Sequence, residues 1–209
     1  MLSVTGASGA ALLELGVGLG AAGAAGAVGV ANAATPTAGT LAVKPDLAAK
    51  PAANPGAKAT VKGSQGNYTA SVFVAASAKR AWSVLTNYEA MAGVMPDIKE
   101  AKVVRRSGAT LELQQTYLAP YTFGRRIKAT LAMQETAPRQ LSYQLIKGDQ
   151  IRQLKGTWTI TPVSGGVLLR HQIQVDPEIP GFVRPLYYEL TEANLQQSMQ
   201  ILKRLIEKG

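Results

Sequence analysis

Residues 183–207 read VRPLYYELTEANLQQSMQILKRLIE, and this stretch decides the fold. Pro185 is compatible with a helix only near its first turn, so a helix is expected from about Val183 to Glu207. Spacings of four, three and four separate its main apolar residues, which places them on one face: Leu195, Met199, Leu202 and Ile206. This face requires a partner elsewhere in the chain.

The chain before this helix predicts a series of β-strands. Residues 123–133 are the clearest case, because apolar and polar positions alternate as in an antiparallel strand with one face in water. A short helix beginning after Ser77 and a helical turn at 91–94 follow the first strand. The expected strands are 68–74, 98–106, 111–117, 123–133, 141–145, 154–160 and 167–175.

This order of elements predicts an α+β fold. A curved antiparallel sheet of six to seven strands is expected to wrap around the long C-terminal helix, because no other segment is long enough to cover the apolar face of the sheet. A sheet that bends around one helix leaves a space between the two. Whether that space is filled or hollow decides between a packed core and a binding cavity.

Several local strings resemble one known superfamily. They are VAASAKRAWSVLTNY at 74–88, MPDI at 95–98, GTWTITP at 156–162, and the lead from Pro177 to Pro185 into the terminal helix. Residues 67–207 resemble the START-like (SRPBCC) superfamily of polyketide cyclases and dehydrases, which has the helix-grip fold, and within it the coenzyme-Q-binding branch. The resemblance implies an internal cavity for a hydrophobic small molecule such as a quinone, a lipid or a polyketide-like compound, with no cofactor.

Composition divides the chain near residue 65. Residues 1–65 contain 19 Ala, 11 Gly and no aromatic residue, whereas all twelve aromatic residues lie between Tyr68 and Tyr188. A segment without aromatic residues buries little surface, and it cannot offset the ~1–2 kcal/mol per residue that ordering its backbone costs. We therefore expect residues 1–65 to be a low-complexity tail and residues 66–209 to be the START-like ligand-binding domain.

The predicted tail has two parts. Residues 10–34 are nearly all Ala, Gly, Leu and Val and contain Ala31-Asn32-Ala33, the small-x-small pattern of a signal-peptidase site. The absence of Lys and Arg from residues 1–9, and Glu14, favour instead a low-complexity extension from a wrongly assigned start codon. The first interpretation predicts an exported or membrane-associated protein, and the second a cytoplasmic one. Four prolines within residues 35–65 predict a semi-extended linker.

The composition also excludes several classes of site. The chain has no cysteine and one histidine, His171, which rules out a disulfide framework, a thiol nucleophile and a His-rich metal site. No apolar run predicts a protein with several membrane spans. The net charge is +9. The basic residues on the outer face of the sheet are most simply a solvated surface, and the alternative is a membrane or nucleic-acid patch; they are Arg105, Arg106, Arg126 and Lys128. We expect no nucleic acid as a partner.

Positions that face inward by strand alternation mix aromatic residues with polar tips, whereas a filled core would favour aliphatic residues. Arg125 falls on this face, where it requires a carboxylate or a polar ligand group unless the strand bulges and turns it outward. His171 is more typical of a hydrogen-bonded cavity residue than of a catalytic one, and inward carboxylates are not evident, so we predict no catalytic residue. The expected ligand-binding residues are Leu113, Tyr117, Arg125, Tyr143, Trp158, His171 and Met199.

Two proline-containing segments with apolar side chains are expected at the cavity entrance, where they could also touch a membrane transiently. The residues concerned are Met95, Pro96, Ile179, Pro180 and Phe182.

Three functions fit the chain at this point. The first is non-catalytic binding or carriage of a hydrophobic small molecule. The second is a cyclase or dehydratase acting through His171 or Arg125, and the third is a peripheral membrane-surface protein. The lack of an evident catalytic constellation favours the first.

Overall fold

The computed structural model describes residues 58–118 and 125–208, which contain eight strands, three α-helices and one short 3-10 helix. The strands are β1 (Thr60–Ser64), β2 (Asn67–Val74), β3 (Ile98–Ser107), β4 (Thr110–Leu118), β5 (Arg126–Thr136), β6 (Gln140–Gly148), β7 (Ile151–Val163) and β8 (Gly166–Pro177). The helices are α1 (Ala78–Leu85), α2 (Tyr88–Met91), η1 (Gly181–Val183) and α3 (Arg184–Glu207).

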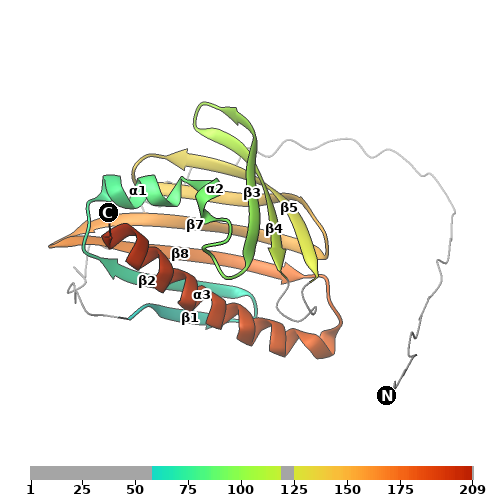
Figure 1. The fold of residues 1–209 in the computed structure, drawn as a ribbon. Helices are drawn as coiled ribbons and strands as arrows, with labels where there is room; N and C mark the ends of the chain where they lie inside the picture. The colour runs from blue at the N-terminus through green and yellow to red at the C-terminus, as the bar shows by residue number, and fades with distance from the viewer. Residues whose placement is uncertain (1–57, 119–124, 209) are drawn as a thin grey trace, which may run out of the picture. The chain divides into compact units, whose positions relative to one another are not determined.

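All eight strands form one antiparallel sheet in the order β1-β2-β8-β7-β6-β5-β4-β3. In Figure 1, α3 crosses one face of this sheet, and α1 lies near the C-terminal end of α3. The predicted stripe on α3 is confirmed, because its four apolar residues are buried against the sheet. The predicted α+β helix-grip architecture is likewise confirmed.

The sheet has one strand more than the predicted six to seven. β1 lies inside residues 1–65, yet it pairs with β2 from Thr60↔Ser71 to Ser64↔Asn67. Ala59, directly before β1, is buried. The folded region therefore begins before residue 66, because an edge strand can satisfy its backbone by pairing and needs no aromatic side chain to do so. Residues 1–57 of the expected tail lie outside the described residues.

Side chains near the C-terminus of α3 attach the helix to the start of the fold. The Arg80 guanidinium in α1 donates to the carbonyl oxygens of Leu205 (3.2 Å) and Ile206 (3.4 Å), where the helix dipole favours a cation. Lys203 Nζ donates to the carbonyl of Phe73 at 2.9 Å. The position of α3 across the sheet is thus set at this end by hydrogen bonds as well as by its apolar face.

The core consists of two apolar clusters that meet at Trp82 and Trp158. One joins α1 and α3 to β2, β7 and β8, and includes Met199, Leu202 and Ile206. The other lies on strands β4 to β8 and includes Leu113 and Leu131. Each fully buried side chain of this size contributes about 1.5–3 kcal/mol. A cavity lined by members of both clusters separates part of the sheet from α3.

Candidate functional site

An internal cavity of about 250 Å³ lies between the inner face of the sheet and α3. Most of its wall is apolar, and α3 adds the polar side chains of Thr191, Asn194 and Ser198. The sequence predicts seven ligand-binding residues. Six of the seven predicted residues line the cavity: Leu113, Tyr117, Tyr143, Trp158, His171 and Met199.

Three of these side chains form a connected group on neighbouring strands. The Tyr143 hydroxyl on β6 lies 2.8 Å from Nε2 of His171 on β8. Trp158 of β7 is the register partner of His171, and its ring stacks on the imidazole with centroids 3.8 Å apart and an interplanar angle of 5°. The imidazole is thus held on one edge by a hydrogen bond and on one face by an aromatic ring.

Gly156 provides the space for this group. It is the register partner of Tyr143 on β6 and of Ile173 on β8, two residues from His171 along that strand. A Cβ at this position would lie 2.6 Å from Cζ of Tyr143 and 2.5 Å from the backbone oxygen of Gln172. Only glycine therefore allows the Tyr143 side chain to cross β7 and reach His171.

Burial keeps the side chains of Tyr143 and His171 uncharged. Desolvation lowers the pKa of His171 from 6.5 to about 3. Desolvation also raises the pKa of Tyr143, and the charge of Asp97 raises it further. At neutral pH the two side chains form a hydrogen bond between uncharged groups, whichever ring nitrogen carries the proton.

Asp97 is a cavity residue that the sequence analysis missed, and it corrects the expectation that no carboxylate faces inward. It lines the cavity, and desolvation raises its pKa. Its charge also raises the pKa of Tyr117 and of Tyr143, two further residues of the cavity wall. Asp97 belongs to the MPDI string in a proline-containing loop before β3. In such a loop no alternation of apolar and polar residues indicates which way a side chain points.

Arg125 does not belong to this wall. Its side chain is exposed, and it lies directly before the first residue of β5. The predicted inward orientation is therefore wrong, because alternation predicts a face only within the paired strand. No bulge is needed to turn Arg125 outward, since β5 begins one residue later, at Arg126.

The two predicted entrance segments lie at one end of the strands, rather than beside an outermost strand of the sheet. We call this the Pro177 edge: β4 and β8 end there at Leu118 and Pro177, and β5 and β7 begin there. The loop before β3 reaches it through the bond from Leu118 N to Asp97 O (2.9 Å). The segment after β8 reaches it through the bond from Glu178 N to Gln150 O (2.8 Å).

The five predicted entrance residues differ in exposure. Met95 is buried and lines the cavity, Pro96 is partly buried, and Ile179 is buried. Pro180 and Phe182 are exposed. Cavity residues reach the same edge at Leu118, Ile151 and Pro177. Both segments thus lie at the end of the fold where the cavity approaches the surface.

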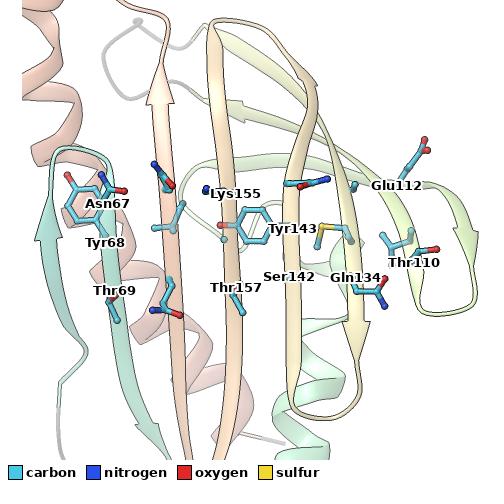
Figure 2. A pocket seen from close by; sticks show the side chains of 18 of the residues that line it. Asn67, Tyr68, Thr69, Thr110, Glu112, Gln134, Ser142, Tyr143, Lys155 and Thr157 are labelled. Carbon is cyan, nitrogen blue, oxygen red and sulfur yellow. The ribbon is translucent and has the colours of Figure 1, made fainter. Parts of the chain in front are cut away.

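A wider groove of about 1340 Å³ lies over the opposite, outer face of the sheet (Figure 2). Hydroxyl and amide side chains cover it, including Thr69, Ser142, Thr157 and Gln134. The guanidinium groups of Arg105 and Arg106 at its side pair with Glu112 and Glu135. This polar, largely neutralised surface fits a solvated sheet face, so the internal cavity is the better candidate site.

Other structural features limit the chemistry. Among the residues that the structure describes, no three His, Asp or Glu side chains come together to hold a metal ion. Within the same residues, no helix combines the length and the apolar character needed to cross a bilayer.

A family model described as "Polyketide cyclase / dehydrase and lipid transport" matches residues 65–207. The chain belongs to this family. The match covers the whole sheet from β2 onward together with α3, so the cavity lies inside the family domain. No curated protein matches the sequence.

Solved structures similar to this polyketide cyclase/dehydrase family member share its fold at low sequence identity. A Thermus thermophilus protein has a TM-score of 0.60 at 18% identity, over 66% of this chain and 94% of that one. The Zhui aromatase/cyclase from a Streptomyces species has a TM-score of 0.53 at 14% identity, over 68% and 91%. A STAR-related lipid transfer protein from Xanthomonas axonopodis has a TM-score of 0.54 at 18% identity, over 70% and 89%.

These names include an aromatase/cyclase and a lipid transfer protein, and the family description covers both activities. At these identities the likeness shows the fold alone. The choice between binding and chemistry in this family member therefore depends on its own cavity residues.

Proposed function

We propose that the protein binds one hydrophobic small molecule in the internal cavity and leaves it chemically unchanged. The observation that carries this proposal is an apolar cavity whose polar groups gather around Tyr143, His171 and Asp97. Ligand sites typically combine a mostly apolar wall with a few polar groups that set the orientation of the ligand.

The size of the cavity limits the ligand. At about 250 Å³ it is slightly smaller than the ~300–1,000 Å³ of typical ligand sites. It suits a ring system, such as the head of a quinone or a short polyketide-like compound, stacked near Trp158. A long hydrocarbon chain would have to extend from the cavity, and the Pro177 edge is the side on which the wall reaches the surface.

The electrostatics of the cavity favour binding over catalysis. A general acid or base works best when its pKa lies near the working pH. The pKa of His171 is lowered to about 3, while the pKa values of Tyr117 and Tyr143 are raised above 10. At neutral pH these groups donate and accept hydrogen bonds but do not exchange protons readily.

Asp97 favours a second candidate, a cyclase or dehydratase. Asp97 lines the cavity and its carboxyl group has a pKa raised by desolvation, as a general acid–base group would need. In this alternative Asp97 would carry the proton transfer, and Tyr143 and His171 would position the substrate.

Two variants of α3 test whether the cavity holds the ligand. Ser198→Phe places a large side chain into the cavity, whereas Gln197→Phe places the same side chain on the exposed face of the helix. Ligands that copurify with the full chain are identified by native mass spectrometry and then titrated into the emptied protein. Ser198→Phe should weaken binding at least tenfold and Gln197→Phe should not. Equal binding by the wild type and Ser198→Phe would place the ligand elsewhere.

The enzyme alternative has its own readout. The protein is incubated with quinones, fatty acids and poly-ketone chains, and products are sought by mass spectrometry. We expect recovery of the unchanged compounds. A product whose formation falls roughly a hundredfold in Asp97→Asn, with binding retained, would replace the binding proposal by the enzymatic one.

A further inference from the structure

Exposed large apolar side chains gather at the Pro177 edge. Five such residues are exposed among those the structure describes, and four lie in segments that border this edge: Val94, Ile146, Phe182 and Leu186. Phe182 is 87% exposed, the highest value of the five. The fifth, Val104, lies near the far end of β3. Apolar residues scattered over a surface need no explanation, but their concentration at one end does.

The four residues come from three separate segments along this edge. Val94 lies in the loop before β3, which the bond from Gly93 N to Ile98 O (2.9 Å) closes. Ile146 lies two residues before the end of β6. Phe182 in η1 and Leu186 in the first turn of α3 follow β8 closely, and Figure 1 shows α3 beginning near the end of β8.

Positive charge accompanies these apolar residues. The pairs Arg126–Glu100 and Arg184–Asp176 neutralise two cations at this edge. Apart from Asp97, which lines the cavity, three further carboxylates lie near it on the surface, in Asp149, Glu178 and Glu189, and they are outnumbered by cationic side chains. The cations are Lys99, Lys128, Lys147 and Arg152.

We propose that the Pro177 edge is a docking surface for an anionic phospholipid bilayer. Phe182 and Leu186 enter the boundary between head groups and acyl chains, and Lys147 and Arg152, which flank the β6–β7 turn, contact the lipid phosphates. A bilayer fits better than a protein partner, because the apolar residues stand on three segments with cations between them and do not form one groove for a helix or strand.

This docking goes beyond ligand binding, and it has a consequence for it. The cavity wall reaches the same edge at Leu118, Ile151 and Pro177. A docked protein would therefore exchange a hydrophobic molecule with the bilayer over a short path with little exposure to water. Membrane binding itself requires no ligand and is tested with the empty protein.

The test is sedimentation of the full chain with vesicles of phosphatidylcholine alone or of phosphatidylcholine mixed with phosphatidylserine. The wild type should bind the mixed vesicles more tightly, with an affinity that falls as salt rises. The double variant Phe182→Ser/Leu186→Ser should bind at least tenfold more weakly. Lys147→Glu/Arg152→Glu should also lose at least tenfold, and most of the dependence on salt.

Matched controls lie away from this edge. Val104→Ser removes an exposed apolar side chain near the other end of β3, and Lys155→Glu reverses a charge on the outer face of the sheet. Both should bind vesicles like the wild type, and all variants should keep the unfolding temperature measured without vesicles. Equal binding of both vesicle types by the wild type, or unchanged binding by the Phe182→Ser/Leu186→Ser variant, would overturn the docking surface and leave the cavity proposal standing.

Discussion

Gly156→Ala is the substitution for which the structure makes the sharpest prediction. The added methyl group would lie 2.5 Å from the backbone oxygen of Gln172 and 2.6 Å from Cζ of Tyr143. The backbone of β8 is held by its register with β7 and cannot withdraw, so the Tyr143 ring has to move. Its hydroxyl then leaves His171, and a buried ring nitrogen loses its partner.

The expected cost follows from three contributions. Overpacking a filled site costs about 1–3 kcal/mol, and losing the Tyr143–His171 hydrogen bond costs about 0.5–1.5 kcal/mol. Replacing glycine by alanine returns about 0.4–1 kcal/mol by restricting the unfolded chain. The sum is a destabilisation of about 0.5–4 kcal/mol, with a central value of about 2 kcal/mol that lowers the unfolding temperature of a domain of this size by about 4–8 °C.

Urea unfolding of the full chain, followed by tryptophan fluorescence and far-UV circular dichroism, measures this loss. Gly181→Ala is the control, because the same methyl group meets nothing within 4 Å there. Adding Tyr143→Phe should recover part of the loss, since it removes one of the atoms that the new Cβ meets. If Gly156→Ala unfolds within about 0.5 kcal/mol of the wild type, the role given to Gly156 is wrong.

Three further predictions concern His171 and the start of the domain. His171→Asn should leave ligand affinity within about tenfold, or ~1.4 kcal/mol, by calorimetric titration; a larger loss would make the imidazole a principal contact. His171 titrates near 6.5 in the unfolded chain and near 3 in the folded one, so the unfolded state binds the extra proton first as pH falls. The free energy of unfolding should therefore drop by up to about 1.4 kcal/mol per pH unit between about pH 6 and pH 4. His171→Asn should lack this component. An equal loss of stability from pH 7 to pH 5 in both proteins, measured by urea unfolding, would contradict the prediction. Asp97, whose pKa is raised, acts in the opposite direction in both proteins and does not affect the comparison. A chain beginning at Lys58 should have the unfolding temperature of the full chain. A chain beginning at Gly66 should unfold several degrees lower, because it lacks β1 and the buried Ala59. Equal unfolding temperatures of the two shortened chains would make β1 dispensable.

The start of the fold shows where sequence patterns were insufficient. β1 has the sequence TVKGS, with little alternation and no aromatic side chain. Its stability comes from pairing with β2 and from Ala59, whose carbonyl accepts a hydrogen bond from Gln196 of α3 at 3.5 Å. The pairing with β2 joins neighbouring segments of the chain, whereas the bond to α3 joins residues 137 positions apart, and composition reveals neither.

The cavity wall shows the opposite case. Within a paired strand successive side chains point to opposite faces, so strand alternation alone assigned Leu113, Tyr143 and His171 to the interior. The same rule failed for Arg125, which precedes its strand, and it was silent for Asp97, which lies in a loop. Both residues required the actual start of a strand to be known.

The sequence by itself determined the order of the strands from β2 onward, the apolar stripe of α3 and the inner face of most strands, because these follow from local periodicities of 3.6 and 2 residues. It also determined that the only histidine would lie on an inner face. Only the tertiary structure decided that the Tyr143 hydroxyl reaches His171 over Gly156, that Asp97 joins the same cavity, and that exposed apolar residues of three segments lie along the Pro177 edge. These features depend on register and on curvature of the sheet, which bring together residues far apart in the chain, and no local pattern encodes them.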